Sequence, residues 1–167
     1  MFAHRPVPDP VGPGQESVWD YPRPPRLEPT NQHVVVVLGG IVIIDTHSAF
    51  RVLETSHPPG YYLPIADIAT GVLRPTAGSS FCEFKGDASY YDLVAGRTTA
   101  QQAAWGYSSP TSGFVELADC ISLYPAQMDQ VTVDGEIVRP QEGNFYGGWV
   151  TGAVVGPFKG GPGTRGW

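Results

Sequence analysis

The clearest pattern of apolar positions is a pair of β-branched runs at residues 33–38 and 41–45. They are separated by Gly39-Gly40. A two-residue Gly-Gly loop fits the tight turns that join antiparallel strands, and β-branched side chains pack well on a pleated surface. Because the apolar runs are nearly unbroken, we expect a hairpin that is covered on both faces.

Shorter apolar stretches bounded by turn residues predict further strands. In the stretch that begins at Phe50, the side chains of Phe50, Val52 and Glu54 fall on one face of the strand and that of Arg51 on the other. Pro64 stands at a favourable first helical position, which predicts a short helix at 64–72, and one helical turn is expected at 114–118. The predicted strands are 50–55, 61–63, 80–85, 88–94, 103–107, 120–124, 130–133 and 136–138, with Gly86-Asp87 and Asp134-Gly135 as hairpin turns.

The two ends of the chain differ in composition from the middle. Residues 1–30 contain eight prolines and little apolar periodicity, which predicts an extended arm anchored by Trp19, Tyr21 and Leu27. Residues 143–167 are rich in glycine and aromatic side chains, Phe145 among them, and predict an irregular tail. We therefore expect an arm at 1–30, a β core at 31–142, and a tail at 143–167 that packs on the core and lies against the arm.

Composition and charge limit the classes of function that the protein can have. The chain has 167 residues with 21 glycines, 17 prolines and a net charge of −6, and its basic residues do not cluster, so we expect no nucleic-acid partner. No apolar run approaches the roughly 20 residues of a membrane helix, and no secretory signal is visible at the start. These features predict a soluble cytoplasmic protein with no membrane partner. Cys82 and Cys120 permit at most one disulfide, and no Cys-x-x-Cys or His cluster predicts a metal or cofactor.

Polar side chains gather in two short stretches of this charge-poor chain. Glu54 and His57 are candidates for an acid/base pair, and Cys82 is a candidate nucleophile whose thiolate His57 or Lys85 would stabilise. Structural roles remain open: Cys82 as inert core packing, Glu54 in an ion pair with Arg51 or Lys85, and His57 bonded to a backbone carbonyl of its own turn. The predicted ligand-binding side chains are Arg51, Tyr61, Lys85, Tyr91 and Trp105.

Four blocks of sequence, at residues 16–25, 54–59, 80–86 and 145–160, together resemble the family known as domain of unknown function 427. The resemblance implies a β-tent, in which two antiparallel sheets meet at an angle, as in the thalidomide-binding domain of cereblon and in methionine sulfoxide reductase type B. Those relatives hold zinc through two Cys-x-x-Cys pairs that this chain lacks, so no metal is expected. A nucleotidyltransferase activity would need paired carboxylates for Mg²⁺, and none follows Gly78-Ser79.

These observations predict a mainly β protein with one or two short helices and a small-molecule site between the two sheets. The site would bind or transform a small polar metabolite. An alternative is a non-catalytic interaction module that uses the Pro-rich arm and the Gly/aromatic tail to bind a partner chain. A homodimer formed by arm exchange is a further possibility.

Overall fold

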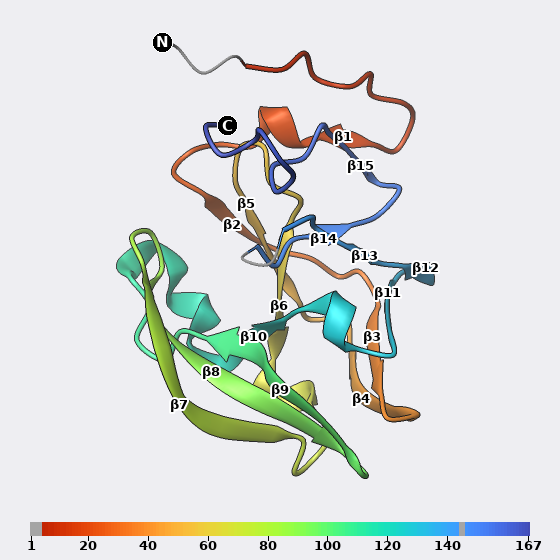
Figure 1. The fold of residues 1–167 in the computed structure, drawn as a ribbon, viewed down its shortest axis with the longest axis vertical. Coiled ribbons are helices and arrows are strands. Elements are labelled where there is room, and N and C mark those ends of the chain that lie inside the picture. The colour runs from red at the N-terminus through yellow and green to blue at the C-terminus, as the bar shows by residue number, and fades with distance from the viewer. Residues whose placement is uncertain (1–4, 144–145) are drawn as a thin grey trace.

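The larger of two main sheets has seven antiparallel strands. The structure is a computed structural model that describes residues 5–143 and 146–167, and it is mainly β, as predicted. The strand order in this sheet is β2-β5-β6-β10-β9-β8-β7, and the sheet curves strongly (Figure 1). Its strands are β2 (Arg26–Pro29), β5 (Phe50–Leu53), β6 (Gly60–Pro64), β7 (Leu73–Cys82), β8 (Gly86–Ala95), β9 (Thr98–Gly106) and β10 (Cys120–Leu123).

The smaller sheet has four antiparallel strands in the order β12-β11-β3-β4. These are β3 (Val34–Leu38), β4 (Ile41–Thr46), β11 (Gln130–Val133) and β12 (Glu136–Ile137). The main hydrophobic core contains side chains from both sheets, such as Val36 and Ile43 from the smaller one and Leu63 and Ile121 from the larger one. The two sheets therefore pack against each other, which confirms the predicted fold class.

The hairpin of β3 and β4 has the predicted Gly39-Gly40 turn, and both glycines have positive φ angles of 58° and 74°. The expectation that both of its faces are covered is wrong at the start of β4, although Ile43 and Ile44 further along the strand are buried. Ile41 and Val42, which directly follow the Gly39-Gly40 turn, are 44% and 51% exposed, and β4 is the edge strand of its sheet. An unbroken apolar run does not distinguish a central strand from an edge strand.

Several predicted boundaries move in the structure. The helix expected at 64–72 is only the 3-10 turn η2 (Ile65–Asp67), because Ile68 takes an extended conformation and bridges to Ile44 of β4. The β7–β8 hairpin turns at residues 83–85 instead of Gly86-Asp87, with Cys82 opposite Gly86. The helical turn expected at 114–118 lies within η3 (Ser112–Asp119), and η4 (Pro125–Gln127) follows β10.

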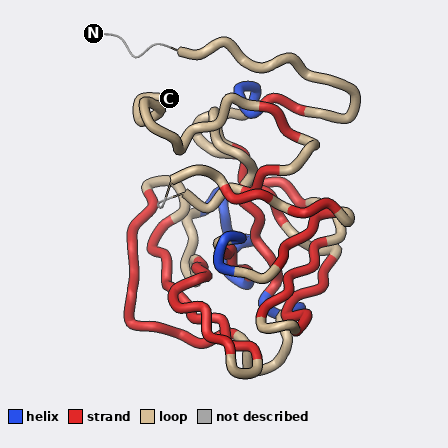
Figure 2. The backbone as a smooth tube through the Cα atoms, turned by 45° about the vertical axis from the view of Figure 1, so that its right-hand side comes forward, coloured by secondary structure: helices blue, strands red, loops and turns tan. Residues whose placement is uncertain are grey.

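The two ends of the chain pack on each other (Figures 1 and 2). β1 (Glu16–Ser17) pairs in parallel with β15 (Val154–Val155), and η1 (Val18–Asp20) follows β1. The indole of Trp19 donates to the Pro157 carbonyl at 2.9 Å and contacts Trp167 edge-on, with ring centroids 5.6 Å apart. The predicted anchors Trp19 and Tyr21 are buried.

Both ends also contribute to the body of the protein. Residues 26–29, expected in the arm, form β2 at the edge of the seven-stranded sheet. In the tail, β14 (Trp149–Val150) pairs with β13 (Arg139–Pro140), and Trp149 is fully buried in the main core. Phe145 of the predicted tail and the first four residues of the arm lie outside the described residues. Within the described chain, no helix has the length and apolar character needed to cross a membrane.

Candidate functional site

A cavity of about 470 Å³ opens on one face of the seven-stranded sheet. Strand alternation places it on the side away from the four-stranded sheet, because Tyr61 and Leu63 of β6 enter the main core while Tyr62 between them lines the cavity. The cavity therefore does not lie between the two sheets, where the sequence predicts a site. The cavity is lined by Val52, Glu54, His57, Pro58, Gly60, Tyr62, Ser80, Phe81, Cys82, Glu83, Phe84, Lys85, Tyr90, Trp105, Tyr107, Tyr124, Gln141, Tyr146, Gly147, Gly148 and Lys159.

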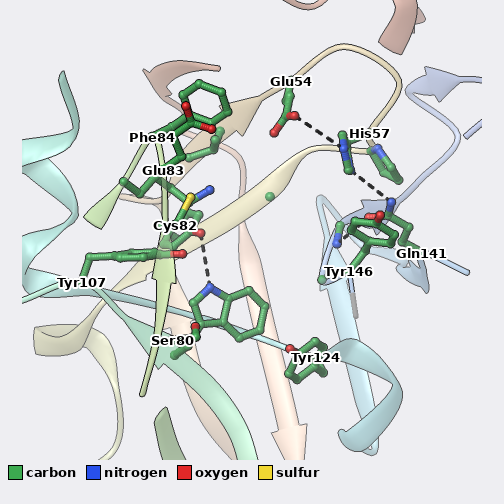
Figure 3. Close-up of a pocket in the computed structure, with 18 of the residues that line it drawn as sticks. Glu54, His57, Ser80, Cys82, Glu83, Phe84, Tyr107, Tyr124, Gln141 and Tyr146 are labelled. Carbon is green, nitrogen blue, oxygen red and sulfur yellow. Dashed lines mark hydrogen bonds and ion pairs between the residues drawn. The ribbon is translucent and has the colours of Figure 1, made fainter. Parts of the chain in front are cut away.

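Glu54 and His57 meet at the rim of this cavity, in the turn that follows β5 (Figure 3). The turn is closed by the His57 backbone N–H, which donates to the Glu54 carbonyl at 3.0 Å, and Ser56 has a positive φ of 73°. The Glu54 carboxylate lies 3.7 Å from His57 Nε2 and 3.3 Å from Arg23 Nη2. Glu54 therefore has an ion pair, but with Arg23 instead of the expected Arg51 or Lys85.

Gln141 fixes the orientation and the tautomer of His57. The Gly148 N–H donates to Gln141 Oε1 at 3.0 Å, and Gln141 Nε2 donates to the Lys159 carbonyl at 2.7 Å. The same amide nitrogen lies 3.3 Å from His57 Nδ1. Because an amide nitrogen only donates, Nδ1 is the acceptor, and the neutral ring carries its proton on Nε2, on the side of Glu54.

His57 is held in the neutral form. Burial of the ring, reinforced by the positive charges of Lys159, Arg23 and Lys85, lowers the pKa of His57 to about 4. The Glu54 carboxylate would oppose this shift, but its ion pair with Arg23 offsets its attraction for a proton on the ring. At neutral pH, His57 is therefore an N–H donor at Nε2, with little tendency to take up a second proton.

Cys82 and Lys85 occupy the opposite wall, where β7 ends and the hairpin turns toward β8. Figure 3 shows Cys82 and Phe84 facing His57 and Gln141 across the cavity. The half-buried Cys82 is a free thiol. Among the described residues it makes no hydrogen bond to Glu54 or His57, so the three predicted catalytic side chains share one pocket without forming a relay.

The ammonium of Lys85 lies 5.7 Å from the ring centroid of Tyr107. Burial alone lowers the pKa of Lys85, but interactions with Tyr62, Cys82 and Glu54 outweigh it and raise the pKa above its ordinary value. Lys85 is therefore fully charged at neutral pH, on the wall that carries the Cys82 thiol.

Aromatic rings form the floor between these two walls. The Trp105 indole N–H donates to the Tyr62 hydroxyl at 3.4 Å, and the ring centroids of Trp105 and Tyr124 are 4.6 Å apart. Tyr107 packs near Tyr62 with centroids 6.2 Å apart. Trp105 is among the predicted ligand-binding residues, whereas on β6 the prediction names Tyr61 instead of Tyr62, because the sequence does not show which face of this short strand meets the core. Gln141 and Lys159 carry no signal in the sequence that links them to this site.

Three predicted ligand-binding side chains lie elsewhere. Arg51 points to the opposite face of β5 from Val52 and binds Glu16 and Glu28 at 2.6 and 2.5 Å. Tyr61 stacks on Trp149 with centroids 4.7 Å apart, and its hydroxyl donates to Gln32 at 2.8 Å. Tyr91 packs against the main core. Proximity in sequence grouped these residues with the site, whereas strand alternation separates them from it.

The described residues hold no group of three His, Cys, Asp or Glu side chains that could bind a metal ion. Cys82 and Cys120 are both free, so they form no disulfide with each other. The polar side chains that line the cavity provide an imidazole N–H donor, carboxylates, two ammonium groups and a thiol.

Comparison with known proteins identifies the family. No curated protein matches the sequence. A family model described as Domain of unknown function (DUF427) matches residues 26–134. The match includes Glu54, His57, Cys82 and their neighbours on the sheet, whereas Gln141 and Lys159 lie beyond it. Because the match covers more than half of the chain, the protein belongs to the family Domain of unknown function (DUF427).

Proposed function

We propose that the cavity on the seven-stranded sheet binds a small polar metabolite with a flat ring. The observation that carries the proposal is the lining of the cavity: an aromatic floor between two walls that present different polar groups. Its volume of about 470 Å³ is in the range of small-molecule sites. Tyrosine and tryptophan side chains suit a flat ligand because they offer a rigid apolar face together with a polar edge.

The wall with His57 would recognise a group that both donates and accepts hydrogen bonds, such as an amide. His57 Nε2–H is a donor, and the adjacent Glu54 carboxylate is an acceptor. Gln141 holds the ring in this tautomer through its bond to Nδ1. A preformed donor and acceptor reduce the entropy that is lost on binding.

The alternative of an interaction module built from the arm and the tail has less support. Trp19 and Tyr21 are buried, and Trp167 packs on Trp19. These three aromatic side chains of the two ends are thus engaged in contacts within the chain.

The test uses the indole N–H signals of the four tryptophans in the full chain, recorded by ¹⁵N NMR during titration with small ring compounds. The Trp105→Phe variant identifies the signal of Trp105. Compounds that bind in the cavity should shift this signal before those of Trp19 and Trp167, which pack on each other and do not line the cavity. If compounds shift only Trp19 and Trp167, or if no compound of a broad panel shifts Trp105, the proposed site is wrong.

A further inference from the structure

Both lysines of the chain line this one cavity. The ten basic residues comprise eight arginines and two lysines, Lys85 and Lys159, in a protein of net charge −6. The two lysines come from distant segments, the β7–β8 turn and the tail, and both contribute to the cavity wall. Both lysine side chains of this acidic protein therefore line the site proposed above.

Lys85 is a half-buried cation that forms no direct ion pair with a carboxylate in the described part of the chain. Among the described residues, no carboxylate oxygen lies within 4.0 Å of its ammonium. The nearby Glu54 is bound to Arg23 at 3.3 Å, and Glu83 is an exposed side chain at the rim. The Lys85 ammonium instead forms a side-chain hydrogen bond with Cys82 and lies 5.7 Å from the ring centroid of Tyr107. A charge removed from water favours a partner of opposite sign, and a ligand can supply it.

Lys159 adds a second positive charge to the same cavity. Its ammonium donates to the Trp167 carbonyl at 3.2 Å and lies 5.8 Å from the Tyr146 ring centroid. Burial is the largest cause of the low pKa of His57, and the positive charges of Lys159, Arg23 and Lys85 lower it further, so these three cations lie near the His57 side of the cavity. Of the two ammonium groups, Lys85 is the one without a protein oxygen among its hydrogen-bond acceptors in the described chain.

We propose that the ligand is a flat organic anion whose carboxylate binds Lys85 while its ring lies against Trp105 and Tyr124. This inference rests on the proposed function and specifies its ligand class. An ammonium–carboxylate hydrogen bond is charge-assisted and stronger than a neutral one. The floor of the cavity supplies the ring surface, and Lys159 attracts the anion at longer range.

The test compares indole-3-carboxylate, indole-3-carboxamide and indole on the full chain, at low and high salt. The three probes share the same ring, so differences in dissociation constant report the charged group. The carboxylate should bind at least about tenfold more tightly than the amide, which corresponds to about 1.4 kcal/mol. The difference should shrink as salt screens the ion pair. In Lys85→Met the preference for the carboxylate should disappear, while Arg74→Met, which removes an exposed cation on β7 outside the cavity, should keep it.

A second measurement does not depend on a variant. Protein labelled with ¹³C-lysine has two side-chain signals, one from each lysine, and the carboxylate should shift the Lys85 signal while the amide does not. Equal affinity for carboxylate and amide, with Trp105 shifted by both, would overturn the anion inference and leave the proposed site intact. If none of the three probes shifts Trp105 or either lysine, the anion inference fails, and the proposed site fails as well only if no compound of the broad panel shifts Trp105.

Discussion

Acidification should destabilise this protein through His57. The native pKa of His57 is about 4, against an ordinary value of 6.5. Between these values the unfolded chain binds a proton that the native ring does not bind. The free energy of unfolding is therefore unaffected by His57 above about pH 7 and falls as the pH drops from 6.5 toward 4. The side chain is only 16% exposed, so solvent screens this effect weakly.

The size of the effect follows from the two pKa values. Moving from pH 7.5 to pH 5.0 should cost about 2 kcal/mol through His57 alone, on the linkage relation for a single titrating group. The assay is urea unfolding at both pH values, with His57→Asn as the matched variant. Asparagine does not titrate, and its side-chain oxygen can still accept a hydrogen bond from Gln141.

The comparison isolates one group, because every other titrating residue is common to both proteins. The wild type should lose about 2 kcal/mol more than His57→Asn between pH 7.5 and 5.0. An NMR titration of the His57 ring provides the independent check. Equal losses in the two proteins, or a ring that titrates near pH 6.5, would refute the argument that burial and three nearby cations hold His57 neutral.

Three further predictions concern residues outside the His57 pair. Arg51→Met should lower the free energy of unfolding by about 2 kcal/mol, since it leaves two partly exposed carboxylates without their partner. Ligand binding should not change, and weaker binding would show that Arg51 contributes to the site. Iodoacetamide should modify Cys82 first, because burial raises the pKa of Cys120 to about 11, and mass spectrometry showing Cys120 modified first would contradict this. Trp19→Ala should cost about 3 kcal/mol in urea unfolding and speed proteolysis of the arm, and unchanged protection would show that the contact is not needed.

Much of the fold could be predicted from local patterns. Gly39-Gly40 and Asp134-Gly135 each join two strands of the smaller sheet, because positive φ is easily reached there. The aromatic anchors Trp19 and Tyr21 could be identified because large rings in an extended Pro-rich segment are stabilised by burial against the rest of the domain. The prediction of a helix at 64–72 is wrong because Ile68 bridges to β4. Local propensity does not report such a tertiary contact.

The candidate site could be predicted only in part. Glu54, His57, Cys82 and Lys85 share a cavity, although β6, β10, β9 and β8 lie between β5 and β7 in the sheet. Arg51 was grouped with them by sequence distance, although its side chain points to the other face of β5. Gln141 and Lys159 reach the cavity from a segment far away in sequence, and such long-range proximity is set by the tertiary fold instead of by any local pattern.

The pairing of β1 with β15 also sets the order in which the protein can be completed during synthesis. Glu16 is made early, and its strand partner Val154 emerges from the ribosome only after most of the chain has been translated. The tautomer of His57 likewise cannot be fixed until Gln141 has been synthesised. Contacts of such long sequence separation slow folding. A nascent chain halted before the tail would thus contain every strand of its two main sheets. It would lack part of the cavity lining and the strand that pairs with β1.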